Sequence, residues 1–195
     1  MDIGINQEKN SRTLYRYNTN KFSLYIALGS IVMMFTAFTS AYIVRQSAGN
    51  WLEFPLPDLF YVSTAIILIS SITLHLSYNT FKRRRETLYK GLLILSFILG
   101  ITFVVTQYYA WMEMFTMGID LKRNPSGAFV YVITGAHAAH VLGGIATFIV
   151  ALIHAFSLPF RVTDKRKNRF QLVLIYWHFV DFLWIYLLLF FTLQR

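Results

Sequence analysis

The feature that most constrains this chain is the arrangement of its apolar residues, which form five long blocks separated by short polar segments. Each block has at least about 20 predominantly apolar residues, enough for an α-helix to cross the hydrocarbon core of a bilayer. The blocks lack the amphipathic stripes of a soluble helical core. The sequence therefore predicts an all-α membrane protein with five transmembrane helices, at about residues 22–44, 59–80, 91–117, 128–156 and 170–193.

The composition excludes several other classes of protein. The chain is 56% hydrophobic and only 14% charged, values that a soluble domain of 195 residues rarely reaches. The absence of cysteine excludes disulfides, thiol nucleophiles and cysteine-ligated zinc or iron–sulfur sites. A net charge of +9 would favour nucleic-acid binding in a soluble protein. Here the basic residues lie between apolar blocks, so we expect no nucleic-acid partner.

The positions of the basic residues predict the orientation of the chain. Fourteen of the 18 lysines and arginines lie before the first block, between the second and third, or between the fourth and fifth. Short loops rich in Lys and Arg stay in the cytoplasm, so we expect a cytoplasmic N-terminus and an outside C-terminus. Residues 1–21 would form a cytoplasmic tail without a signal-peptide pattern, and residues 22–195 one five-helix domain. The basic loops either set this topology alone or also attract anionic lipid headgroups or an acidic partner.

Two polar motifs lie near the middle of the last two blocks. The fourth block contains T-G-A-H-A-A-H-V-L-G-G, in which His137 and His140 are three residues apart. The fifth contains Y-W-H-F-V-D-F-L-W, from Tyr176 to Trp184. At helical spacing, the fifth-block side chains Trp177, His178, Asp181 and Trp184 gather on one side of a helix.

Asp181 is the residue whose surroundings most need an explanation. A carboxylate surrounded by hydrocarbon is costly, so it should face protein rather than lipid. At 1.5 Å per residue, both motifs lie near the membrane midplane, which places them at the same depth. The candidate partners of Asp181 are therefore Trp177, His178, His137 and His140. Small residues around the histidines favour close helix packing, above all Gly135, Gly143 and Gly144.

Three interpretations of these polar groups remain open at this point. The simplest is a structural network inside the bundle, including bound lipid. A metal or haem site is a second interpretation, although His-x-x-His alone is weak and no Glu-x-x-His pair accompanies it. The third is a proton relay, which needs a continuous chain of groups or waters to both surfaces, and few other groups in the blocks are ionisable.

The two motifs, in this order, resemble subunit III of the haem–copper terminal oxidases, that is, cytochrome c oxidase subunit 3 and the related quinol oxidase subunit. The family pattern T-G-x-H-x-x-H-V-x-x-G is met between Thr134 and Gly144, and Y-W-H-F-V-D-x-x-W between Tyr176 and Trp184. Gln107 also matches a family glutamine. The resemblance covers about residues 21–193, and the five-span length is similar to bacterial forms that lack two extra N-terminal helices.

The resemblance implies a non-catalytic, multi-pass subunit of a proton-pumping respiratory oxidase, which reduces oxygen to water in the bacterial inner (cell) membrane. Haems and copper would lie in partner subunits, so no catalytic residue, cofactor or metal is expected in this chain. It would pack against subunit I, assemble with subunit II and other oxidase subunits, sometimes within a respiratory supercomplex, and hold phospholipid. A quinol oxidase subunit III and a small proton channel or transporter are the alternatives. The structural and lipid-cleft network would comprise His137, His140, Trp177, His178, Asp181 and Trp184.

Three positions depart from the family pattern, because each lacks a glutamate that the family usually carries. They are Ile31, Ala110 and Gln171. Ile31 matters most, since the family's buried carboxylate at that position is linked to proton or oxygen delivery. Its loss would leave Asp181 as the only acid deep inside a span.

Overall fold

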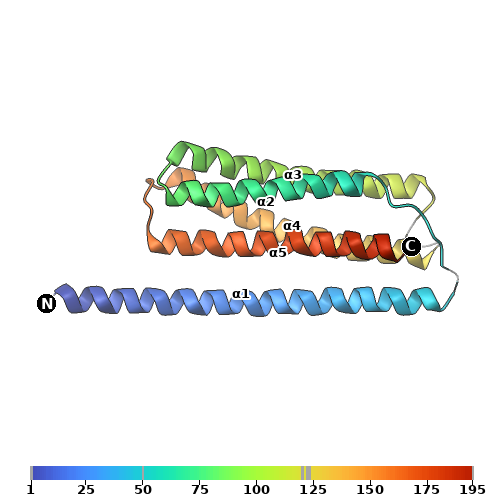
Figure 1. The fold of residues 1–195 in the computed structure, drawn as a ribbon, viewed down its shortest axis with the longest axis horizontal. Helices are drawn as coiled ribbons and strands as arrows, with labels where there is room; N and C mark the ends of the chain where they lie inside the picture. Colours follow the sequence, from blue (N-terminus) through green and yellow to red (C-terminus); the bar gives the residue numbers. More distant parts are fainter. Residues whose placement is uncertain (1, 50, 120, 122–123, 195) are drawn as a thin grey trace.

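The computed structural model describes residues 2–49, 51–119, 121 and 124–194, and within these ranges the side chains from residue 19 onward. The described chain forms five α-helices that lie along a common axis (Figure 1). All five contain a segment long and apolar enough to cross a membrane, which confirms the predicted fold class. The helices are α1 (Asp2–Ser47), α2 (Leu59–Lys82), α3 (Glu86–Thr116), α4 (Pro125–Ser157) and α5 (Asp164–Leu193).

The two ends of the bundle differ in charge. The α2–α3 and α4–α5 connections lie at the end nearer the N-terminus, whereas the C-terminus lies at the opposite end (Figure 1). Both connections are rich in lysine and arginine. We call the end formed by residues 82–90 and 158–169 the basic end. Its assignment to the cytoplasm remains a prediction.

Helices α2 to α5 surround a common core, and α1 packs on one side of it. Within the described chain, α2 contacts α3 and α5, and α4 contacts α3 and α5. Helix α1 contacts α4 and α5 but neither α2 nor α3. In Figure 1, α1 accordingly runs beside α5, away from α2 and α3.

The α2–α3 contact is built on small polar residues. Ser63, Ser70 and Ser77 are seven residues apart on α2 and are fully buried. The Ser70 hydroxyl donates to the Ser96 carbonyl of α3 at 3.0 Å, and the Ser77 hydroxyl donates to the Tyr89 carbonyl at 3.0 Å. Small side chains that also bond across the interface let two helix backbones approach closely in a membrane.

Several helices begin earlier than the apolar blocks predict. Helix α3 begins at Glu86, α4 at Pro125 and α5 at Asp164, each before the predicted span. Helix α1 begins at Asp2, so the predicted boundary between residues 21 and 22 lies inside one continuous helix. Hydropathy locates only the part of a helix that suits lipid, because a helix continues into water until a cap ends it. The side chains of residues 1–18 lie outside the described part of the chain.

Candidate functional site: a buried aromatic and histidine cluster

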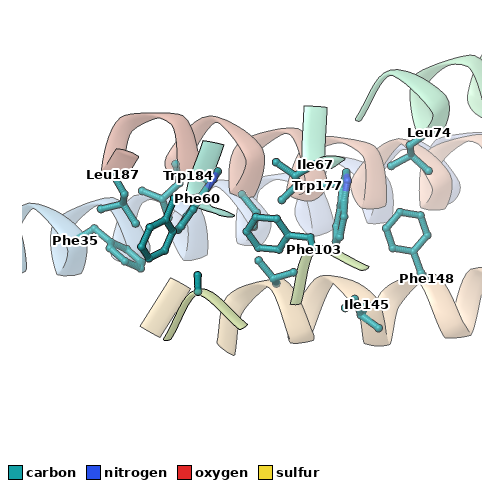
Figure 2. Close-up of a cluster of buried hydrophobic side chains, with 14 of the residues drawn as sticks. Phe35, Phe60, Ile67, Leu74, Phe103, Ile145, Phe148, Trp177, Trp184 and Leu187 are labelled. Carbon is teal, nitrogen blue, oxygen red and sulfur yellow. The ribbon is translucent and has the colours of Figure 1, made fainter. Parts of the chain in front are cut away.

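Trp184 of α5 joins three neighbouring helices through a single side chain. Its indole N–H donates to the Thr64 hydroxyl of α2 at 2.9 Å. The ring stacks on His137 of α4, with centroids 5.0 Å apart, and meets the Phe103 ring of α3 edge-on at 5.3 Å. Figure 2 shows Trp184 beside Phe60 and Phe103 in the core. Since only 1% of Trp184 is exposed, it is a packing centre for α2, α3, α4 and α5.

The two histidines of α4 have different surroundings. His137 is fully buried, and neither ring nitrogen has a hydrogen-bond partner among the described residues. Phe35 of α1 lies edge-on to both histidine rings, with centroids 6.4 Å from His137 and 5.7 Å from His140. The His140 Nδ1–H donates to the Ala136 carbonyl of its own helix at 2.7 Å. In the described ranges, no three His, Asp or Glu side chains gather closely enough to hold a metal ion.

Trp177 of α5 occupies a notch that two glycines create. A Cβ atom added at Gly144 of α4 would lie 2.8 Å from the indole ring, and one at Gly100 of α3 would lie 2.9 Å from it. The Phe148 ring closes the notch edge-on, with a centroid distance of 4.7 Å. Figure 2 shows Trp177 beside Phe148 and Ile145. Gly144 was expected to allow close helix packing, and it does so by leaving room for the Trp177 ring of α5.

The other two packing glycines of α4 differ from Gly144. A Cβ atom at Gly143 would lie 3.3 Å from the Tyr176 hydroxyl, which donates to the His140 carbonyl at 2.9 Å. A Cβ atom at Gly135 would meet nothing within 4 Å. Gly135 therefore serves no close helix approach among the described residues, because a Cβ atom there would enter open space.

Asp181 is buried, with 3% of its surface exposed, as its cost in lipid requires. Its polar neighbour is the Ser71 hydroxyl of α2. Neither carboxylate oxygen meets hydrogen-bond geometry with a described residue. The expected partners are not the ones found, because Asp181 lies beside Ser71 of α2 and it is Trp184 that stacks on His137. Those expected partners were Trp177, His178, His137 and His140.

A second polar group lies at the surface between α2 and α5. The Ser71 hydroxyl contacts Nδ1 of His178, and the His178 and His75 rings lie 5.8 Å apart. His178 is half-buried and His75 is exposed. We call Ser71, His75 and His178 the α2–α5 polar face. Measured along the helices from Lys82 and Phe170, the two rings lie about 10–12 Å into the membrane from the basic end.

The resemblance implies a glutamate at three positions that hold other residues in this chain. Ile31 packs half-buried against the core, Ala110 is fully buried, and Gln171 is half-buried. The matched glutamine, Gln107, donates from Nε2 to the Ser63 hydroxyl at 2.8 Å. This neutral bond joins α3 to α2 near Trp184.

Two hydroxyl groups of α2 beside the cluster were not predicted from the sequence. Thr64 accepts the Trp184 indole, and Ser71 lies beside Asp181 and His178. A usable signal was present, because Thr64 and Ser71 are themselves seven residues apart on α2. That spacing places them on one face of a helix, where they indicate a helix neighbour rather than lipid.

Comparison with known proteins identifies the family of the chain. Residues 21–193 match the family model described as cytochrome c oxidase subunit III. The probable cytochrome c oxidase subunit 3 of Mycobacterium tuberculosis (strain ATCC 25618 / H37Rv) is 28% identical over 178 residues, which cover 89% of this chain and 87% of the relative. Cytochrome c oxidase subunit 3 of Corynebacterium diphtheriae is 28% identical over 182 residues, covering 88% and 86%.

A relative with a different printed name shows a comparable level of similarity. The probable quinol oxidase subunit 3 of Staphylococcus saprophyticus is 26% identical over 176 residues, covering 87% of this chain and 86% of the relative. The family match spans all five helices, including both polar motifs. This multi-pass membrane chain therefore belongs to the cytochrome c oxidase subunit III family.

Proposed function

We propose that this chain is the non-catalytic subunit III of a proton-pumping terminal oxidase in a bacterial inner membrane, where it stabilises subunit I and holds phospholipid. Family membership supports its place in a haem–copper oxidase. The observation that carries its role as a docking subunit is the α2–α5 polar face. His75 is exposed there at a depth where a lone chain would meet only lipid tails.

The polar face favours a protein neighbour over lipid. Ring nitrogens in the hydrocarbon region are costly unless they bond to protein or to water in a cavity. The Ser71 hydroxyl is the hydrogen-bond partner of His178 Nδ1. Nε2 of His178 and the ring nitrogens of His75 can therefore form hydrogen bonds with another molecule. A partner helix with a polar group at this depth would satisfy both histidines. In this proposal that helix belongs to subunit I.

The test is purification of the tagged chain from native membranes. The unaltered chain is expected to bring haem-containing subunit I with it. The His75→Leu/His178→Leu variant is expected to lose most of the co-purifying haem, because its polar face no longer matches the partner. Recovery of the unaltered chain without haem–copper subunits would refute the proposal as a whole.

A matched control separates docking from folding. Thr102 is also exposed on a span, and its hydroxyl bonds only to the Ile98 carbonyl of its own helix. Thr102→Leu should therefore leave haem recovery unchanged. A His75→Leu/His178→Leu chain that folds normally and retains full haem would show that another face binds subunit I.

The electron donor of the complex is set by a partner subunit rather than by this chain. The mycobacterial and corynebacterial relatives carry names of cytochrome c oxidase subunits, which favours cytochrome c as the donor. The staphylococcal relative is named for a quinol oxidase and supports the alternative. A copper-binding Cys/His/Met cluster in the co-purified subunit II would identify the cytochrome c form.

A further inference from the structure

Three polar atoms on one turn of α5 are buried without a hydrogen-bond partner among the described residues. They are Nε1 of Trp177 and both carboxyl oxygens of Asp181. Trp177 is fully buried and Asp181 is 3% exposed, so bulk solvent does not reach these atoms. Roughly 90% or more of buried polar groups in folded proteins are hydrogen-bonded, and each exception needs an explanation.

The two side chains lie on the same side of α5. Trp177 and Asp181 are four residues apart, which makes them neighbours on one helix face. Nε1 belongs to the same edge of the indole as Cζ2, which a Cβ atom at Gly100 of α3 would approach to 3.2 Å. The opposite edge faces Gly144 of α4. The N–H is therefore on the α3 side of the ring, and Asp181 lies beside Ser71 of α2, the helix that packs against α3.

The neighbouring hydroxyl cannot satisfy all three atoms. The Ser71 hydroxyl already contacts Nδ1 of His178. A hydroxyl has one proton to donate, so Ser71 can satisfy at most one oxygen of Asp181. At least one carboxyl oxygen and the indole N–H of Trp177 therefore need a further partner.

We infer that an ordered water molecule binds between Trp177 and Asp181 inside the bundle. Water suits this pair because one molecule accepts from the indole N–H and bonds to the carboxyl group, whether that group is ionised or protonated. A metal cation would bind the carboxylate but would leave the N–H unpaired. An anion would bind the N–H but would be repelled by a carboxylate. A buried water makes about three hydrogen bonds, and the Ser71 oxygen is available for the third.

The bound water reduces the cost of burying Asp181, because a bonded carboxyl group is far cheaper to bury than an unbonded one. It also gives position 177 two requirements, a large ring for the glycine notch and an N–H for the water. This inference concerns the interior of the chain and goes beyond its proposed place in an oxidase.

The first measurement locates the water by cryo-electron microscopy of the protein purified from native membranes, at a resolution that shows ordered water. A peak is expected within about 2.7–3.2 Å of both Trp177 Nε1 and one Asp181 oxygen. The peak should persist in Asp181→Asn, which keeps an acceptor oxygen, and should be lost in Asp181→Leu. A direct hydrogen bond between Nε1 and the carboxyl group, or a peak that remains in Asp181→Leu, would overturn the inference.

The second measurement follows the indole N–H itself and can be made on the chain alone. Resonance Raman spectra distinguish a hydrogen-bonded indole N–H from a free one, and subtracting the matching Trp177→Phe spectrum isolates the Trp177 signal. The signal should be that of a bonded N–H in the unaltered chain and in Asp181→Asn, and that of a free N–H in Asp181→Leu. A free N–H in the unaltered chain would refute the inference, even if Asp181→Leu does not fold.

Trp111→Phe is the matched control for both measurements. It also removes an indole N–H, but that N–H donates to the Thr134 hydroxyl at 3.0 Å rather than to water. Trp111→Phe should therefore leave both the peak and the Trp177 signal unchanged. Loss of either in this variant would show that they report general disturbance of the bundle instead of a water bound at Trp177.

Discussion

At the scale of single residues, the packing of Trp177 depends on two glycines, because any larger residue at those positions would place a side chain against the indole ring. Gly144 and Gly100 face its ring at distances that exclude a methyl group. Large side chains in a close-packed core tolerate such intrusions poorly. The position of one aromatic ring thus disfavours any larger residue at Gly100 of α3 and Gly144 of α4.

This contact gives a prediction with an internal control. Gly144→Ala should lower the stability of the purified complex by about 1–3 kcal/mol, because the new methyl group collides with Trp177. Gly135→Ala, on the same helix, should be neutral or stabilising by up to about 1 kcal/mol, since its methyl group enters open space and alanine favours helix. Thermal unfolding of both variants measures the difference. Equal melting temperatures would contradict the packing.

Asp181 marks the limit of what the sequence could predict about the site. Its burial followed from the cost of charge in lipid, and its depth followed from helical rise. Its neighbour Ser71 did not follow, because a neighbour depends on the rotation of α2 relative to α5. That rotation is set by many side chains at once, and none of them is marked as a partner in a single sequence. The stacking of His137 on Trp184 could not be predicted from the sequence for the same reason.

At the scale of helices, substitutions of Ser70 in the α2–α3 contact can distinguish the effect of side-chain size on stability from the effect of an interhelical hydrogen bond. Ser70→Ala removes only one interhelical bond, so we expect a loss of about 0.6 kcal/mol. Ser70→Leu must also force the backbones apart, so we expect a loss of about 1–3 kcal/mol. Unfolding in detergent measures both variants. Ser30→Leu is the control, because Ser30 is exposed and bonds only within α1.

Helix number and order were predictable, whereas helix ends were less so. Apolar length determines how many helices span the membrane. The ends depend on caps in polar segments. The Asn124 side chain accepts from the Ser126 N–H at 2.8 Å with Pro125 in the first turn, and Thr163 accepts from the Arg166 N–H at 3.4 Å. Asn-Pro and Thr-Asp are readable start signals, and they would have moved two predicted starts toward the observed ones.

At the scale of the whole molecule, the orientation can be tested directly because the chain contains no cysteine. A cysteine at Glu53, in the α1–α2 connection, should react with a membrane-impermeant maleimide in intact cells. A cysteine at Arg83, at the basic end, should react only after the membrane is opened, since Lys- and Arg-rich loops stay inside. Both side chains are exposed, so access differs only by membrane side. The reverse labelling pattern would place the N-terminus outside.

The limited contacts of α1 have a consequence for how the protein is made. Among the described helices, α1 contacts only α4 and α5, so it has no neighbour among them until α4 has been synthesised. The α2–α3 hairpin, joined by three residues, can close well before that. Helix α1, although it precedes this hairpin in the chain, is therefore expected to reach its final position after the hairpin, and shorter nascent chains must hold it in lipid or against a membrane chaperone.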